Sequence, residues 1–413
     1  MYQDNINCEY SVLTLPKKII IYFILFIAFC GWSSLSLHIN PWGGDLLVDI
    51  TSILLFAYVF ANRTKISKEE LNSVVSYTLI TACLSIIPAV FDWNASILSF
   101  FRSISFLYYG LAFYYLLNIW KASPSFIIKT VSLFCVIWVV IEVGQQFTYP
   151  VYWFAGRAED EYLGTLENRM GLWRFYIWGV DFVMLAWSIY YARFLGKSKQ
   201  VVKYCVILAL VFAVGLLCYC SRKHIGAFLL SIFAGIILGK KNNSAVRISL
   251  VALGISVLLY TYLNSFLIMS QEATEGQSTG EDFIRMVSLD FFIHDFGTSS
   301  LYPFFGTGFG SVSLGNYLSQ LKEYYHFYQS DVGIIGYYSQ VGLVGVSAII
   351  YYIYVFIRNW KYIDVEYKLF FIMKFMLVVF DFWMMWAVGI VAYGVFLYLL
   401  NENIKYNKLK LVE

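Results

Sequence analysis

Charge is scarce in this sequence. Asp, Glu, Lys and Arg make up 13% of its 413 residues, whereas 60% of the residues are hydrophobic. Soluble domains carry charge on about a quarter of their residues, so this composition excludes an ordinary soluble protein and favours a membrane protein. Proline is rare as well, with 6 residues, which excludes a proline-rich or collagen-like chain.

Motifs for disulfides, zinc and nucleotides are also lacking. The 7 cysteines form no C-x-x-C pair and lie mostly inside apolar runs, so neither a disulfide framework nor a zinc site is expected. The sequence also lacks a glycine-rich motif followed by a basic residue, which would indicate a nucleotide-binding site. The sequence has no internal repeat and no low-complexity tract. We expect no metal site, no nucleotide cofactor and no nucleic-acid partner.

Long apolar runs are what the sequence does contain. A helix needs about 20 apolar residues to cross the hydrocarbon core of a bilayer, and no small-residue cleavage site follows the first run, which is interpreted as an uncleaved span. The last two spans divide one apolar stretch near Trp386. The sequence thus predicts an all-α polytopic membrane protein with about twelve spans, at 18–39, 46–62, 71–90, 95–120, 124–148, 173–195, 201–220, 223–239, 246–268, 330–357, 368–384 and 386–401.

The distribution of Lys and Arg predicts the orientation. Short cytoplasmic loops carry an excess of these residues, and alternate loops hold 19 of the 29 basic residues. This pattern places both termini in the cytoplasm. The residues are Lys17, Lys18, Arg63, Lys65, Lys68, Lys121, Arg193, Lys197, Lys199, Lys203, Lys240, Lys241, Arg247, Arg358, Lys361, Lys368, Lys405, Lys408 and Lys410.

Two outer loops divide the chain into three parts. Residues 1–268 hold the first nine spans and a short outer loop at 149–172. Residues 269–329 form a long outer loop with a polar start, an amphipathic stretch and a glycine-rich segment, Pro303–Gly310. We expect this loop to be a small extracytoplasmic subdomain. Residues 330–413 hold the last three spans and a cytoplasmic tail.

Some basic residues contradict the positive-inside pattern. An arginine inside hydrocarbon costs several kcal/mol unless it faces a cavity or a partner, and any one of these residues can simply pair with a nearby acid. Three of them, Arg169, Arg222 and Arg285, come from separate outer segments and can converge at one pocket. Guanidinium groups bind phosphate oxygens bidentately. These three arginines therefore predict a site for the diphosphate of a polyprenyl lipid, with Arg102 and Arg174 as supporting candidates.

One histidine stands out among the four. His326 ends the long outer loop immediately before a span. A lone histidine is more often structural than catalytic, but imidazole is the side chain best suited to acid–base chemistry near neutral pH. His326 is therefore the candidate general base, with Tyr325 and Asp331 as supporting residues.

Four local patterns resemble the O-antigen polymerase and O-antigen ligase superfamily, the Wzy-type bacterial membrane glycosyltransferases. They are Glu167-Asn-Arg-Met-Gly-Leu, Ser221-Arg222, Arg285 followed by Pro303–Gly310, and His326 ahead of Gly333, Gly336 and Gln340–Gly345. Topology and order along the chain fit as well. One departure is Phe327, where the family often has Asn after the histidine.

The resemblance implies a GT-C-like fold and a metal-independent reaction without a cofactor. The growing glycan would pass from undecaprenyl diphosphate to a sugar hydroxyl of another lipid-linked repeat unit, on the periplasmic face of the inner membrane. The product would be O-antigen, a capsule or an exopolysaccharide, and a chain-length regulator protein is a possible partner. Arg169, Arg222 and Arg285 would hold the diphosphate, and His326 would deprotonate the acceptor.

Two alternatives stay open. One is a ligase that transfers the glycan to the lipid A core of lipopolysaccharide. The other is a lipid-linked oligosaccharide flippase or transporter, which twelve spans and outward basic residues would also fit. Transporters commonly have pseudo-symmetric halves. The sequence shows no such repeat, and its long outer loop favours an enzyme.

Overall fold

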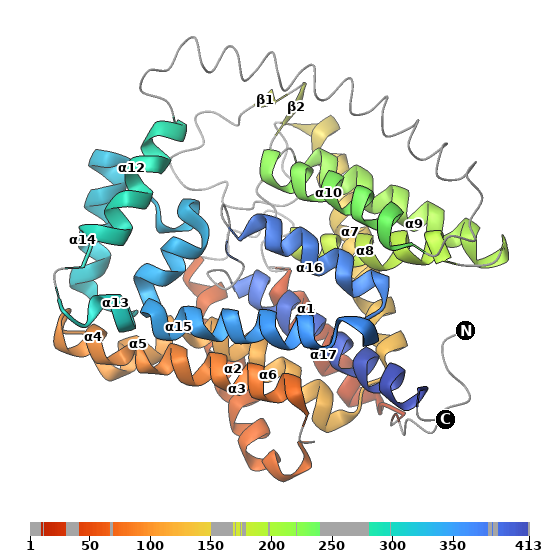
Figure 1. Ribbon diagram of the computed structural model, residues 1–413, viewed down its shortest axis with the longest axis horizontal. Coiled ribbons are helices and arrows are strands. Elements are labelled where there is room, and N and C mark those ends of the chain that lie inside the picture. The colour runs from red at the N-terminus through yellow and green to blue at the C-terminus, as the bar shows by residue number, and fades with distance from the viewer. Residues whose placement is uncertain are drawn as a thin grey trace.

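The computed structural model of this chain is a helical assembly with one small hairpin (Figure 1). It describes residues 10, 12–29, 41–66, 69–149, 168–169, 171–173, 175, 179–196, 199–219, 221–239, 281–297, 299–378, 382 and 387–411. The α-helices are α1 (Leu15–Ala28), α2 (Pro41–Ala61), α3 (Glu70–Leu84), α4 (Ile86–Phe91), α5 (Ile97–Ser103), α6 (Ser105–Trp120), α7 (Pro124–Thr148), α8 (Val180–Gly196), α9 (Lys199–Cys218), α10 (Arg222–Leu238), α12 (Glu281–His294), α13 (Tyr302–Phe305), α14 (Val312–Tyr325), α15 (Gly333–Arg358), α16 (Val365–Leu377) and α17 (Ala387–Leu409). Short 3-10 helices are η2 (Arg63–Lys65), η5 (Gln329–Val332) and η6 (Trp360–Tyr362), and the antiparallel hairpin pairs β1 (Asn168–Arg169) with β2 (Leu172–Trp173).

Several helices have the length and composition of membrane spans. Within the described ranges, three helical stretches are long and apolar enough to cross a bilayer: Glu70–Phe91, Pro124–Thr148 and Gln329–Arg358. The bent pair of α5 and α6 makes a fourth if it counts as one span. This fits the predicted helical membrane protein. The full number of about twelve spans stays a prediction, and the predicted span at 246–268 lies outside the described residues.

Two predicted spans are broken helices. The predicted span 95–120 divides at Ile104, where α5 and α6 meet at an angle of 57°. The predicted span 330–357 lies in α15, which has one non-helical residue, Gly342, with φ 63°. A hydropathy pattern reports which residues are apolar and does not report the backbone conformation of a single residue. It therefore predicts both stretches as continuous helices.

Loops predicted to be cytoplasmic lie together at one side of the helices. Asn359 donates to the Glu70 carboxylate at 2.7 Å, and Lys408 lies 3.6 Å from that same side chain. Asn403 donates to Asp364 at 2.6 Å. These contacts join the α2–α3 connection, the α15–α16 connection and the end of α17. The assignment of this side to the cytoplasm stays a prediction.

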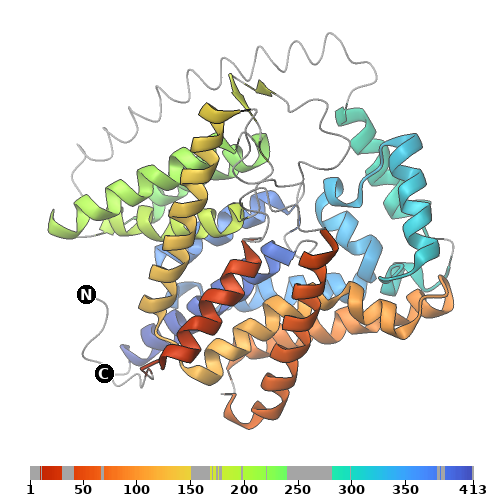
Figure 2. The same ribbon diagram turned by 180° about the vertical axis from the view of Figure 1, so that it is seen from behind.

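A separate lobe is formed by α12, α13 and α14. It lies at the left in Figure 1 and at the right in Figure 2, beside the start of α15. The lobe has its own hydrophobic cluster, which is distinct from the main core of the helical assembly. The buried members of this cluster are Phe292, Phe296, Tyr302, Leu314, Leu321 and Val332.

Candidate functional site

Aromatic packing holds the lobe together. The rings of Phe296 and Tyr317 stack with centroids 5.9 Å apart and join α14 to the segment after α12. The Tyr302 hydroxyl donates to the carbonyl of Phe292. Burial of Tyr302 raises its pKa, so this hydroxyl stays a neutral donor. The lobe is therefore a small packed unit at the edge of the main helices.

The glycine-rich segment attaches the lobe to α15. The positive φ of Gly342 interrupts the helix, which leaves the carbonyls of Ser339 and Gln340 without their usual donors one turn ahead. The segment supplies donors instead. The N–H of Thr307 bonds to Ser339 O at 2.9 Å, and the N–H of Gly308 bonds to Gln340 O at 2.9 Å. The helix break and the glycine-rich segment thus form one unit.

The same segment also packs on α3, α4 and α5. A side chain at Gly308 would overlap the carbonyl of Ser85, and one at Gly310 would overlap the backbone of Ser99. The Ser99 hydroxyl donates to the carbonyl of Gly310. Both glycines have positive φ, 73° and 79°, a conformation that other residues rarely adopt. The pattern that resembles the family signature is therefore a close-packed connection between the lobe and the membrane helices.

His326 caps the lobe's last helix. It follows α14 with a left-handed backbone, φ 56° and ψ 30°, and the turn is closed by hydrogen bonds to Leu321 O and Lys322 O. Glycine or asparagine usually occupies such a cap. The imidazole is exposed and makes no hydrogen bond to any described residue. The backbone is thus fixed, while the ring is available to a ligand.

A pocket of about 310 Å³ begins at the next residue along the chain, Phe327, and has both polar and apolar side chains in its lining. His326 itself does not line it. Two glutamines of the pocket's lining are hydrogen-bonded in a chain, in which the Gln340 amide donates to Gln329 at 3.1 Å and the Gln329 amide donates to Ser339 Oγ at 2.8 Å. Tyr328 also lines the pocket, and the ammonium of Lys322 lies 5.7 Å from the centre of its ring. The lining residues are Leu318, Ser319, Lys322, Phe327, Tyr328, Gln329, Ser330 and Gln340.

The two supporting candidates lie on either side of His326, with Tyr325 at the end of α14 and Asp331 in η5. Asp331 is half-buried, and its carboxylate accepts a hydrogen bond from Ser330 at 3.4 Å. Tyr325 is exposed, with its ring centre 5.7 Å from that of Phe327. Neither side chain contacts the imidazole through a hydrogen bond in the described part of the chain.

The three arginines predicted to hold a diphosphate come from three elements. Arg169 is in β1, Arg222 is the first residue of α10, and Arg285 is in α12. Both views place β1–β2, α10 and α12 in the upper part of the molecule (Figures 1 and 2). The side chains of these arginines, and Arg174 as a whole, lie outside what the structure describes. Their convergence stays a prediction.

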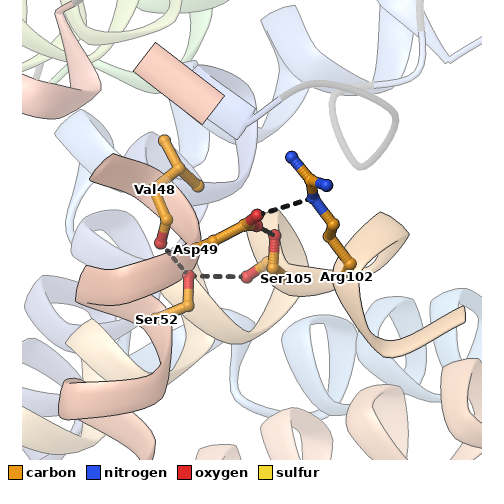
Figure 3. Close-up of polar contacts among 5 residues, drawn as sticks. All are labelled: Val48, Asp49, Ser52, Arg102 and Ser105. Carbon is orange, nitrogen blue, oxygen red and sulfur yellow. Dashed lines mark hydrogen bonds and ion pairs between the residues drawn. The ribbon is translucent and has the colours of Figure 1, made fainter. Parts of the chain in front are cut away.

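Arg102 is the one arginine of the predicted set with a described side chain. It lies in the last turn of α5, away from the pocket, and its Nε donates to the carboxylate of Asp49 on α2 at 3.0 Å (Figure 3). Sequence reasoning assigns no role to Asp49, Tyr328 or Gln340. Asp49 stands out in retrospect, because an acid near the outer end of a predicted span needs a partner.

Ionisable residues are also buried among the helices. The ammonium of Lys374 on α16 pairs with Asp181 on α8. Glu142 on α7 is fully buried, and neither carboxylate oxygen has a hydrogen-bond partner among the described residues. Such groups are expensive inside a membrane protein and are commonly retained for a function.

Comparison with known proteins adds no assignment. Neither a protein-family model nor a curated protein matches this chain.

Proposed function

We propose that this protein is a membrane glycosyltransferase that polymerises undecaprenyl-diphosphate-linked repeat units on the outer face of the bacterial inner membrane. The observation that carries the proposal is the exposed His326, one residue before a pocket that is lined by two glutamine amides and an aromatic ring. Sugars present hydroxyls and apolar C–H faces, so this combination of amides and a ring suits an acceptor sugar. Resemblance of the motifs to the O-antigen polymerase superfamily supplies the donor class.

The reaction follows from the roles of these groups. His326 takes the proton from an acceptor hydroxyl, whose oxygen then attacks the anomeric carbon of the donor glycan. The bond from that carbon to the diphosphate oxygen breaks, and undecaprenyl diphosphate leaves with the negative charge. Arg169, Arg222 and Arg285 would stabilise this charge, since guanidinium groups aimed at a leaving phosphate act most strongly in the transition state.

Loss of the gene in its native host tests the proposal. A polymerase deletion leaves single repeat units on the lipid carrier and removes the long polysaccharide ladder. Long polymer stranded on undecaprenyl diphosphate would instead assign the chain as a ligase. Unchanged polysaccharide would overturn the proposal.

A flippase is the second candidate, and the buried ionisable residues favour it. The pair of Lys374 and Asp181 and the buried carboxylate of Glu142 resemble the intramembrane groups of ion-coupled transporters. The pocket that begins at Phe327 has no role in that account. The two functions are distinguished by where a substitution acts, at Glu142 or at His326.

A further inference from the structure

Arg102 on α5 and Asp49 on α2 form an ion pair at the surface of the helical assembly. Asp49 is largely buried, with 16% of its side chain exposed, whereas 58% of Arg102 is exposed. The carboxylate accepts twice, from Arg102 Nε at 3.0 Å and from the Ser105 hydroxyl at 2.6 Å (Figure 3). Each carboxylate oxygen thus accepts one hydrogen bond, and the guanidinium is held through Nε alone.

The pair rests on a rigid support. Ser105 begins α6 just after the bend at Ile104, and its carbonyl accepts from Ser52 on α2 at 2.9 Å. Two hydrogen bonds thus connect α2 to the bend, through Asp49 and through Ser52. Asp49, which holds the guanidinium at Nε, therefore lies on a helix that is itself hydrogen-bonded to the bend.

The terminal nitrogens of Arg102 are directed away from this support. In Figure 3 they point away from the carboxylate of Asp49, and they make no hydrogen bond to any residue that the structure describes. A purely structural ion pair would favour the two-pronged geometry, in which two N–H groups face two carboxylate oxygens. Here a single nitrogen is used, so four N–H donors remain for another acceptor.

Exposed apolar side chains lie on the same two helices as this ion pair. Leu98 and Phe101 on α5 and Ile53 on α2 are all exposed, with Leu98 at 80%. By the predicted topology this surface lies in the outer half of the membrane. A ligand that accepts hydrogen bonds from Arg102 and also contacts these apolar side chains must carry an anionic group on an apolar tail. A lipid phosphate has this chemistry.

We propose that Arg102, oriented by Asp49, binds the phosphate group of a membrane lipid at the surface of α2 and α5. Asp49 is the positioning residue. The same helix α5 contacts the glycine-rich segment through Ser99, so the site adjoins the connection to the lobe. Identification of the lipid as the undecaprenyl-diphosphate carrier rests on the proposed function; the phosphate site itself does not.

The test is lipid binding to the purified full-length protein, with undecaprenyl diphosphate as the probe. Phosphatidylglycerol and uncharged undecaprenol serve as comparison lipids. Arg102→Gln should weaken binding of undecaprenyl diphosphate by about 10-fold or more, as expected for loss of a charged hydrogen bond. Binding of undecaprenol should not change. Asp49→Asn should weaken binding less, because the charge of Arg102 remains.

Two further variants separate binding from folding. The double variant Arg102→Gln/Asp49→Asn leaves no unpaired charge, so it should unfold at the wild-type temperature and still bind as weakly as Arg102→Gln. Arg63→Gln is the matched control, because Arg63 is an exposed arginine whose described contact is with the ring of Phe60. A double variant that binds undecaprenyl diphosphate within twofold of wild type overturns the site.

The outcomes also separate this inference from the proposed function. If Arg102→Gln weakens phosphatidylglycerol and undecaprenyl diphosphate equally, a lipid phosphate site stands and its assignment to the glycan carrier is wrong. If the wild-type protein binds undecaprenyl diphosphate through Arg102 but forms no polymer, the site stands and the proposed function fails.

Discussion

Thr307 donates its backbone N–H to the carbonyl of Ser339 at 2.9 Å, across 32 residues of chain. This hydrogen bond occupies a carbonyl that the break at Gly342 leaves without a helical donor. The glycine-rich segment and the interrupted helix α15 therefore depend on each other. The arrangement fixes the lobe, and with it His326, relative to the membrane helices.

Gly308→Ala should destabilise the protein by about 2–5 kcal/mol, since it combines a left-handed backbone with overlap against the carbonyl of Ser85. Thermal unfolding of the purified protein measures this effect. Gly315→Ala on α14 is the matched control, because its added methyl group meets open space. Equal unfolding temperatures for the two variants would contradict the close packing of the segment.

Substitutions of His326 must respect its backbone conformation. His326→Ala strains a left-handed cap by about 1 kcal/mol, whereas asparagine tolerates this conformation. His326→Asn should therefore keep the unfolding temperature and slow glycan extension by about 10²–10⁴-fold, the usual contribution of proton transfer. Extension by His326→Asn at the wild-type rate would remove the histidine as the base and direct attention to Asp331.

The amides of Gln329 and Gln340, which line the pocket, should bind the acceptor sugar. Gln329→Ala removes the hydrogen bonds to Ser339 and Gln340, so it should raise the KM for the acceptor by roughly 3- to 10-fold with a smaller effect on kcat. Steady-state kinetics with varied acceptor measures both constants. Gln320→Ala is the control, because Gln320 is an exposed glutamine of α14 that does not line the pocket. A kcat effect without a KM effect would exclude acceptor binding here.

Arg222 should serve the donor diphosphate. Arg222→Ala is expected to abolish polymer while the protein still inserts into the membrane, and Arg222→Lys should restore activity only in part, because lysine keeps the charge and loses the bidentate fork. A polysaccharide ladder at matched protein level reports the result. A normal ladder from the alanine variant would remove Arg222 from the site.

Glu142 separates the enzyme from the transporter. Glu142→Gln keeps the shape of the buried side chain and removes its charge, so a glycosyltransferase that works at His326 should retain at least about half of its activity. A proton-coupled flippase should lose transport of lipid-linked glycan in a vesicle assay. Transport by the wild-type protein that fails in Glu142→Gln would favour the second candidate.

Helical membrane structure was predictable from hydropathy because long apolar runs determine it directly. The predicted span 124–148 coincides with α7, and the predicted span 71–90 falls within Glu70–Phe91. The bend at Ile104 and the break at Gly342 were not predictable. The bend lies where Ser105 bonds to Asp49 on α2. The break lies where the backbone of Phe304 packs against Gly342. Both are contacts with segments that are distant in sequence.

The candidate site likewise has features that the sequence predicts and features that it does not. His326 was identifiable as a titratable residue at a loop end, but its left-handed cap is a backbone property that composition does not reveal. Gln340 lies in a glycine pattern without chemical significance in the sequence, yet it lines the pocket and donates a hydrogen bond to Gln329. The role of Asp49 becomes clear only from its hydrogen bond with Arg102, which lies 53 residues away in the sequence.

The central claim is that this chain joins lipid-linked repeat units, and reconstitution tests it most directly. Purified full-length protein in liposomes is incubated with one defined undecaprenyl-diphosphate-linked repeat unit, and the products are resolved by length. We predict a ladder of multimers with release of undecaprenyl diphosphate, and loss of that ladder in His326→Asn. Folded wild-type protein that leaves the repeat unit unextended would contradict the account.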